Sequence, residues 1–131
     1  MKKYAILATL FGMTAVMLGA FGAHGLRKFV DDHGLEIWNK GVQYQFYHTF
    51  ALFIAFFLFE KYALPAFKTA SMLFCTGILL FSGSLYILAC KDILQISESL
   101  LKVIGPITPL GGLSFIAGWS FLLVGLLKTA K

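Results

Sequence analysis

The chain has 131 residues, of which 59% are hydrophobic and 13% are charged, and its mean hydropathy is +0.82. Ordinary soluble domains carry roughly 25% charged residues, so this composition excludes a typical soluble globular protein. The formal net charge is +5, but the basic residues flank apolar runs instead of forming one patch, which argues against nucleic-acid binding.

Four runs without a charged residue follow one another along the chain, at 4–26, 41–59, 69–90 and 103–127. Each is close to the ~20 apolar residues that cross the hydrocarbon core of a bilayer as a helix. Membrane strands would show alternating polarity, which is absent. We therefore predict an all-α integral membrane fold in which residues 1–131 form one domain. That domain is a four-transmembrane-helix bundle with spans at about 4–26, 41–62, 69–90 and 107–127.

The first run opens like a secretory signal, with two lysines before an apolar stretch, but it reaches spanning length. We interpret it as a retained helix. Small residues recur along it at steps of four and three, and they form one narrow stripe that favours close helix contact. The fourth run repeats this device. The predicted packing positions are Gly12, Gly19, Gly118 and Gly125.

The second span follows a short charged loop in which residues 31–34 have the composition of a turn, so we expect a helix to begin near Leu35. Trp38 is then expected at the membrane interface. The span itself opens with QYQFYHT, residues 43–49, before a purely apolar stretch. Helical spacing aligns Tyr44, Gln45, His48 and Thr49 in a polar strip, which should face the bundle interior because polar groups are costly in lipid.

The third span contains FSGSLY, in which Ser82 and Tyr86 are one turn apart and share a face, while Ser84 points elsewhere on a regular helix. Cys75 and Cys90 lie in this same predicted helix, roughly 22 Å apart, which is too far for a disulfide. Apolar residues at helical spacing within 91–105 then indicate a short interfacial helix before the fourth span. A plain loop is the alternative.

The fourth span opens with GPITPLGG, in which we expect Thr108 to be the N-cap and Pro109 the first helical residue. Gly111 and Gly112 leave backbone N–H groups open to close approach. A helix N-terminus at membrane depth favours anionic or carbonyl groups. An ordinary helix start is the alternative interpretation.

Counting the spans places the unusual segments together, because the first and third loops of a four-span protein lie on the same side of the membrane. The end of the first span, the start of the second, the end of the third and the start of the fourth therefore occupy one membrane half. We hypothesise a polar pocket there. Its candidate residues are His24, Tyr44, Gln45, His48, Thr49, Ser82, Tyr86, Thr108, Gly111 and Gly112.

The functional hypothesis that follows is a binding or conduction module that takes a small polar molecule, an ion or a lipid head group into this pocket. Transport with so few helices would require a homo-oligomer. The alternative is a structural or assembly protein in which the polar cluster only holds the helices in register. A membrane enzyme ranks last, since no catalytic residues, cofactor or metal site can be named: G-x-S-x-G, a P-loop and H-x-x-x-H are all absent.

Lys and Arg are distributed almost evenly, with six on the side of the termini and five on the side of the first and third loops. This distribution weakly favours cytoplasmic termini in a bacterial inner membrane.

Four stretches resemble the YgdD/YwdK family of small inner-membrane proteins, a domain of unknown function (number 423) with a eukaryotic transmembrane branch. They are GAFGAHGL, GVQYQFYHTFAL, FSGSLY and GPITPLGGLSFIAGW, which run in that order from residue 19 to residue 119. QISESLLKVI departs from the pattern, because it is longer than the usual link before the Gly-Pro element. The resemblance supports the membrane fold and the map of the site, and it implies no activity.

Overall fold

The computed structural model describes residues 1–130, and all regular structure in that part of the chain is helical. Four helical segments are long and apolar enough to cross a membrane. This confirms the predicted all-α fold with four spans. The segments are Lys2–Lys28, Asp32–Tyr62, Pro65–Ala89 and Glu98–Thr129.

The first two spans are α1 (Lys2–His24) and α2 (Asp32–Tyr62), joined through a 3-10 turn, η1 (Leu26–Lys28). α2 begins three residues before the predicted start at Leu35, because the Asp31 carboxylate caps it by accepting a 2.7 Å hydrogen bond from the Gly34 N–H. α2 ends at Tyr62, and the left-handed φ of 51° at the following residue, Ala63, terminates the helix.

The third span is one continuous rod with a wide turn in its middle. α3 (Pro65–Gly77) passes into a π-helical segment, η2 (Ile78–Ser82), and then into α4 (Gly83–Ala89). The wide turn brings the backbone of Phe81 against Gly111 of the fourth span, where a Cβ atom would lie 2.8 Å from Phe81 Cα. A residue without a side chain is therefore required at position 111.

The predicted short helix before the fourth span is present as α5 (Glu98–Ile104), although its expected first half is not helical: residues 91–95 form turns and residues 96 and 97 are irregular. Ser97 ends the turns and caps α5, its Oγ accepting from the Leu100 N–H at 3.4 Å. α6 (Ile107–Thr129) follows, with Pro106 at its N-cap position and no side-chain cap. The prediction that Thr108 caps this helix is wrong, because its hydroxyl is bonded to Ser84 instead.

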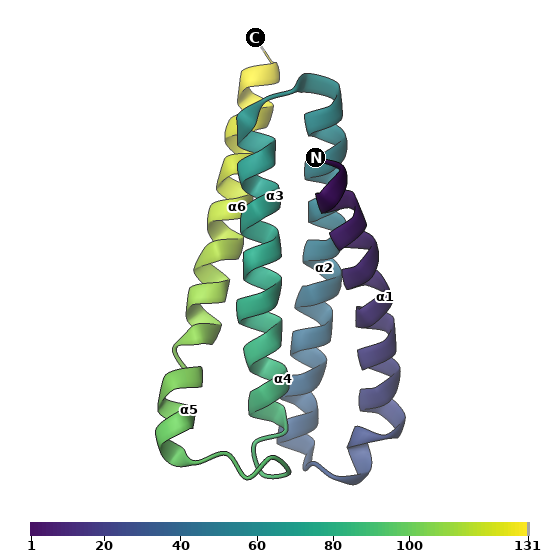
Figure 1. Cartoon of the computed structure of the whole chain (residues 1–131), viewed down its shortest axis with the longest axis vertical. Coiled ribbons are helices and arrows are strands. Elements are labelled where there is room, and N and C mark those ends of the chain that lie inside the picture. The colour runs from purple at the N-terminus through teal and green to yellow at the C-terminus, as the bar shows by residue number, and fades with distance from the viewer. Residues whose placement is uncertain (131) are drawn as a thin grey trace.

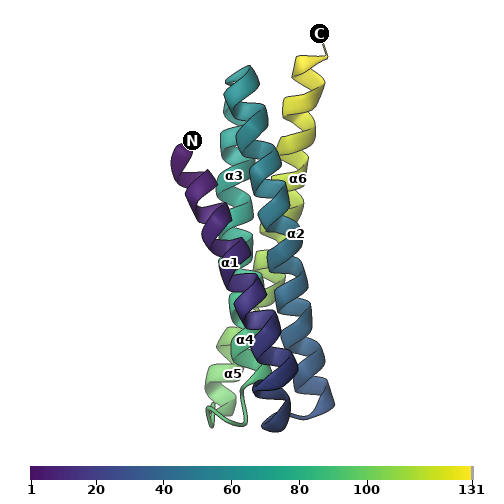
Figure 2. The same ribbon diagram turned by 90° about the vertical axis from the view of Figure 1, so that its right-hand side faces the viewer.

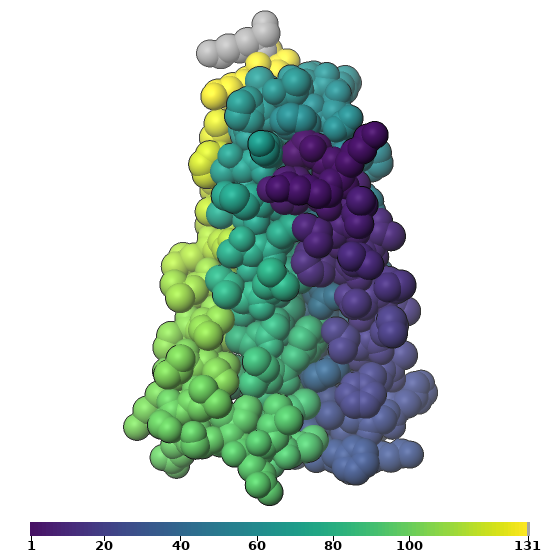
Figure 3. All heavy atoms as spheres, viewed as in Figure 1, coloured from purple at the N-terminus to yellow at the C-terminus, as the bar shows by residue number. Residues whose placement is uncertain are grey.

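The helices pack in the order of the chain (Figures 1 and 2): α1 lies against α2, α2 against the third span, and the third span against α6. α1 and α6 do not contact each other. Both described termini and the α2–α3 turn lie at one end, and η1 and the α4–α5 turns lie at the other, as counting the spans predicts (Figure 1). The molecule is narrow at the end with the termini and wider at the end with α5 (Figure 3).

The contact between the third span and α6 is an antiparallel seam of phenylalanines and glycines. Phe67, Phe74 and Phe81 recur every seven residues, and they meet three α6 glycines with the same spacing. A Cβ atom at Gly118 would lie 2.7 Å from the ring of Phe74, and one at Gly125 would lie 2.8 Å from the ring of Phe67. The predicted packing role of these glycines therefore agrees with the geometry. Gly12 and Gly19 of α1 also face α2, with more space, at 3.5 Å from Thr49 and 3.4 Å from Val42.

Candidate functional site

Gln45 is the polar centre of the half of the bundle opposite the termini. Its side chain is buried, and its Nε2 donates hydrogen bonds to the Phe11 carbonyl oxygen at 2.8 Å and to Thr14 Oγ1 at 2.9 Å. Its Oε1 accepts a 2.7 Å hydrogen bond from the Tyr86 hydroxyl. One amide on α2 thereby joins α1 and α4. Gln45, His48 and Thr49 are buried, but Tyr44 is 36% exposed, so the prediction that the whole strip faces the bundle interior is wrong for Tyr44.

Trp38 repeats the contact with α1 seven residues earlier on α2. Its Nε1 donates to the Leu18 carbonyl oxygen at 2.9 Å, and Leu18 lies seven residues after Phe11, the acceptor of Gln45. Trp38 is buried, with 5% of its surface exposed, although an interface position was expected. The α1–α2 pair is thus fixed in register by two side-chain donors on main-chain acceptors.

The serine and threonine hydroxyl groups of the predicted cluster are all bonded within the protein. Ser82 donates to the Gly41 carbonyl oxygen at 2.7 Å, and Ser84 shares a 2.7 Å hydrogen bond with Thr108 of α6. Ser84 therefore points away from α2, as predicted, but it is buried against a neighbouring helix. Thr49 donates to the Gln45 carbonyl oxygen of its own helix at 2.7 Å.

His48 connects α2 with α6. Its Nδ1 lies 2.7 Å from the Tyr44 carbonyl oxygen, which can only accept, so Nδ1 carries a proton. Its Nε2 is then free to accept, and Trp119 Nε1 donates to it at 3.3 Å. The imidazole ring stacks on Phe115 with 3.4 Å between ring centroids and 8° between ring planes. The ring is therefore held as the neutral Nδ1–H tautomer.

A groove of about 530 Å³ opens beside His48 on the outer surface between α2 and α6. Its walls are aromatic, with Tyr44 stacked on Phe81 at 4.6 Å between centroids. Tyr47 and Trp119 are 59% and 46% exposed, so the groove faces the surroundings of the bundle rather than its interior. Among residues 1–130, the Tyr44 and Tyr47 hydroxyls have no hydrogen-bond partner. We call this the α2–α6 groove; its residues are Tyr44, Tyr47, His48, Phe81, Gly112, Phe115, Ile116 and Trp119.

The predicted site residues thus divide into two groups. Three line the α2–α6 groove, namely Tyr44, His48 and Gly112, and Gly111 packs on Phe81 behind it. Five are in hydrogen bonds between or within helices: Gln45, Thr49, Ser82, Tyr86 and Thr108.

His24 belongs to neither group, since it is exposed at the end of α1. Sequence reasoning missed Tyr47, Phe81, Phe115 and Trp119, because large apolar side chains are ordinary in a membrane span. Cys75 and Cys90 are free thiols, as predicted, and residues 1–130 contain no group of three or more His, Cys, Asp or Glu side chains suited to a metal ion.

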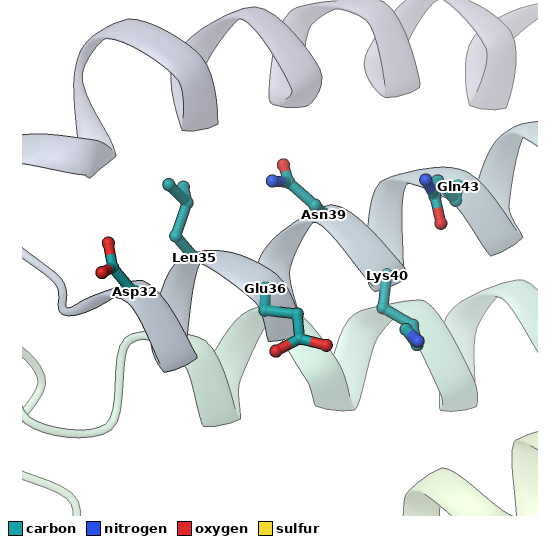
Figure 4. Close-up of a pocket in the computed structure, with 6 residues that line it drawn as sticks. All are labelled: Asp32, Leu35, Glu36, Asn39, Lys40 and Gln43. Carbon is teal, nitrogen blue, oxygen red and sulfur yellow. The ribbon is translucent and has the colours of Figure 1, made fainter.

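A second hollow, of about 400 Å³, lies along the first turns of α2 (Figure 4). Its polar and charged residues all belong to this one helix, so it has no second wall that could enclose a ligand. We interpret it as the exposed face of α2 near the membrane surface. Its residues are Asp32, Leu35, Glu36, Asn39, Lys40 and Gln43.

Four helices of spanning length, joined by hydrogen bonds between their polar side chains, define a small multi-pass membrane protein. Residues 18–112 match the family model described as "Protein of unknown function (DUF423)". The chain belongs to this family, as its resemblance to YgdD/YwdK proteins implied.

Relatives named as membrane proteins match nearly the whole length of this chain. It is 45% identical over 129 residues to UPF0382 membrane protein YwdK of Bacillus subtilis (strain 168), covering 98% of each chain. It is 43% identical over 130 residues to UPF0382 membrane protein SAB0533 of Staphylococcus aureus (strain bovine RF122 / ET3-1), covering 99% of each. No solved structure matches the chain.

Proposed function

We propose that the protein is a binding module for a small molecule dissolved in the bilayer, which enters the α2–α6 groove from the side. The observation that carries this proposal is the groove itself, with its aromatic walls and with His48 at its base. Its volume of about 530 Å³ lies within the range of roughly 300–1,000 Å³ that is usual for ligand pockets.

The chemistry of the lining indicates the class of ligand. The aromatic rings of Phe81, Phe115 and Trp119 favour a flat or apolar body. The Tyr44 and Tyr47 hydroxyls can each donate and accept, so the ligand should also carry at least one hydrogen-bonding group. The His48–Trp119 hydrogen bond is long at 3.3 Å and therefore weak, so a ligand group can replace one partner.

Hydrogen bonds inside the bundle favour a binding role over a conduction role. Gln45, Ser82 and Tyr86 would have to line a polar path through the bundle, but their side chains are hydrogen-bonded to protein groups. Lateral binding in the α2–α6 groove also needs no second copy of the chain. We further propose that the protein lies in the bacterial cytoplasmic membrane with both termini in the cytoplasm, as the slight excess of Lys and Arg favours.

A structural or assembly role is the second candidate, and the contacts of Gln45 and Trp38 favour it. These two donors hold α1 on α2 in one register, as expected if the polar cluster serves only to hold the helices together; we call this the helix-lock role. In that case the α2–α6 groove would hold only bulk lipid.

A thermal-shift screen of purified protein separates the two candidates. The compounds are ring-containing lipophiles, long-chain alcohols and acids, small polar metabolites and ions. A Cβ atom at Gly112 meets nothing closer than 3.9 Å, so Gly112→Leu fills the α2–α6 groove without a backbone clash. Gly83, with nothing within 4 Å of its Cβ position, provides the matched control Gly83→Leu.

The binding proposal expects a lipophile that raises the melting temperature of wild type and Gly83→Leu but not of Gly112→Leu. If no compound shifts the wild type, or if Gly112→Leu responds equally, the helix-lock role is favoured.

A further inference from the structure

A second apolar groove, separate from the α2–α6 groove, lies at the end of the bundle opposite the termini. It has a volume of about 480 Å³, and segments of α1, η1, α2 and α4 with its following turn build its walls. Trp38 and Tyr86 lie at its inner side, tilted against each other at 4.7 Å between ring centroids. We call it the end groove; its residues are Phe21, Leu26, Phe29, Trp38, Tyr86, Ile87, Cys90, Ile93 and Leu94.

Basic residues adjoin the lining of the end groove in the chain. Arg27 and Lys28 lie in the chain directly between the lining residues Leu26 and Phe29, and both are exposed. Lys91 follows Cys90, but Asp92 stands beside it and offsets its charge. Asp31 and Asp32 come three and four residues after Lys28, but the Asp31 carboxylate accepts from the Gly34 N–H and Asp32 lines the separate hollow along α2. The basic residues that directly adjoin lining residues in the chain are therefore Arg27 and Lys28.

The groove also lies at the depth where acyl chains meet head groups. Phe29 and Leu94 are 73% and 58% exposed, yet each is within two residues of a charged side chain. An exposed apolar side chain and a charged side chain can be close in sequence without an unfavourable free energy at the membrane interface. There the apolar side chain faces acyl chains, and the charged one faces phosphates and water. Phe29 and Leu94 therefore extend the apolar lining outward, while Arg27 and Lys28 reach the polar layer.

From these observations we infer that the end groove is a site for an anionic phospholipid, with one acyl chain on Trp38 and Ile87 and the phosphate on Arg27 and Lys28. A chain that leaves the bilayer for the groove exchanges one apolar environment for another, so chain burial gives little selectivity. Discrimination comes from the head group, because guanidinium binds phosphate in a bidentate manner and basic pockets attract anionic lipids. The site is independent of the proposed function, which concerns a different pair of helices.

Tryptophan quenching by brominated lipid tests this site directly. The chain has two tryptophans, so Trp119→Phe leaves Trp38 as the only one, at the wall of the end groove. The variant is reconstituted into phosphatidylcholine bilayers, and a rising fraction of the lipid is replaced by phosphatidylglycerol or phosphatidylcholine with brominated chains. If the site prefers anionic lipid, brominated phosphatidylglycerol quenches the fluorescence of Trp38 at a lower mole fraction than brominated phosphatidylcholine does.

We expect phosphatidylglycerol to be preferred by at least about fivefold, the effect of roughly one basic residue near an anionic head group. Arg27→Gln with Lys28→Gln should abolish the preference. Lys61→Gln with Lys68→Gln removes the same charge at the other end of the bundle and should leave the preference unchanged. In the parent protein, which is Trp119→Phe without further substitution, a higher salt concentration should weaken the preference for phosphatidylglycerol.

Equal quenching by the two lipids in the parent protein would overturn the inference, because it would mean that bulk lipid alone fills the end groove. A preference that survives the loss of Arg27 and Lys28, or one that does not respond to salt, would also overturn it. If soluble glycerophosphate removed the preference for phosphatidylglycerol, the head group alone would account for the selectivity. The acyl chain would then have no role in binding, which contradicts the inferred site.

Discussion

The Tyr86 hydroxyl donates a 2.7 Å hydrogen bond to Oε1 of Gln45, which lies 41 residues earlier in the chain. The same amide donates through its nitrogen to the Phe11 carbonyl and the Thr14 hydroxyl on α1. In a membrane the hydrophobic effect does not drive helices together, so such contacts and close packing determine which helices meet. Gln45 is therefore the residue at which three of the four spans are held in register.

Substitutions at this contact should show unequal costs. Gln45→Ala removes three hydrogen bonds, leaves the Tyr86 hydroxyl without a partner and opens a cavity, whereas Tyr86→Phe removes one hydrogen bond and leaves one amide oxygen unpaired. Each variant leaves one buried group unpaired at about 1–3 kcal/mol, and the cavity adds to the cost of Gln45→Ala, which should lower the free energy of unfolding more. A double-mutant cycle in detergent should give a coupling of about 0.6–1.7 kcal/mol. Additive effects would show that the Tyr86–Gln45 hydrogen bond does not contribute to stability.

The glycine seams should respond differently to the same small substitution. A Cβ atom at Gly118 would lie 2.7 Å from Phe74, but one at Gly19 would meet nothing closer than Val42 at 3.4 Å. Gly118→Ala should therefore cost about 1–3 kcal/mol through overpacking, and Gly19→Ala should be close to neutral. Leucine should destabilise at both positions. Adding Phe74→Leu should rescue part of the Gly118→Ala loss; no rescue would mean that the two residues do not meet in the membrane.

The sequence was sufficient to predict the spans and the place where the unusual segments meet. Gaps between charges set the number of spans, and counting spans put QYQFYHT, FSGSLY and GPITPLGG in one membrane half. The inward direction of Gln45 followed from the cost of polar groups in lipid.

The partners of these residues could not be predicted. Gln45 and Trp38 bond to main-chain carbonyls of α1, and every residue has a carbonyl, so no sequence signal marks Phe11 or Leu18 as the acceptor. The π-helical turn at Ile78–Ser82 also changes the faces of the third span, and regular 3.6-residue spacing does not foresee it. Phe115 and Trp119 could not be singled out, because large apolar side chains occur along the whole fourth span.

Cysteine labelling tests the orientation of the chain. With Cys90 replaced by alanine, a membrane-impermeant maleimide should label Ser97→Cys in intact cells, and it should leave Ala130→Cys unlabelled unless the cells are opened. This follows from the basic residues on the side of the termini. The reverse pattern would place the termini outside.

The native Cys90 thiol provides a second labelling site at the end of the bundle opposite the termini. Burial raises the pKa of the Cys90 thiol, so less of the reactive thiolate is present at neutral pH than for an exposed cysteine at position 97. We expect Cys90 in wild type to react more slowly than Ser97→Cys, and the difference to narrow as the pH rises. Equal rates at neutral pH would show that Cys90 is not shielded by the end groove.

Two substitutions at His48 separate packing from hydrogen bonding. His48→Phe keeps a ring to stack on Phe115 but loses the hydrogen bond to the Tyr44 carbonyl oxygen and the long one from Trp119, so it should cost about 1–2 kcal/mol. His48→Ala also opens a cavity and should cost more. Both should lose any ligand-dependent rise in melting temperature if the ligand contacts the imidazole. If His48→Phe retains that rise, the ligand does not contact the imidazole nitrogens.

The most direct measurement of the binding claim is the set of small molecules that stays with the protein when it is extracted from its own membrane in mild detergent. Mass spectrometry would compare wild type, Gly112→Leu and Gly83→Leu after identical washing. The α2–α6 groove predicts a compound with an apolar body and a hydrogen-bonding group that is retained by wild type and Gly83→Leu and lost from Gly112→Leu. An identical set of lipids from all three proteins would contradict a binding role for the groove.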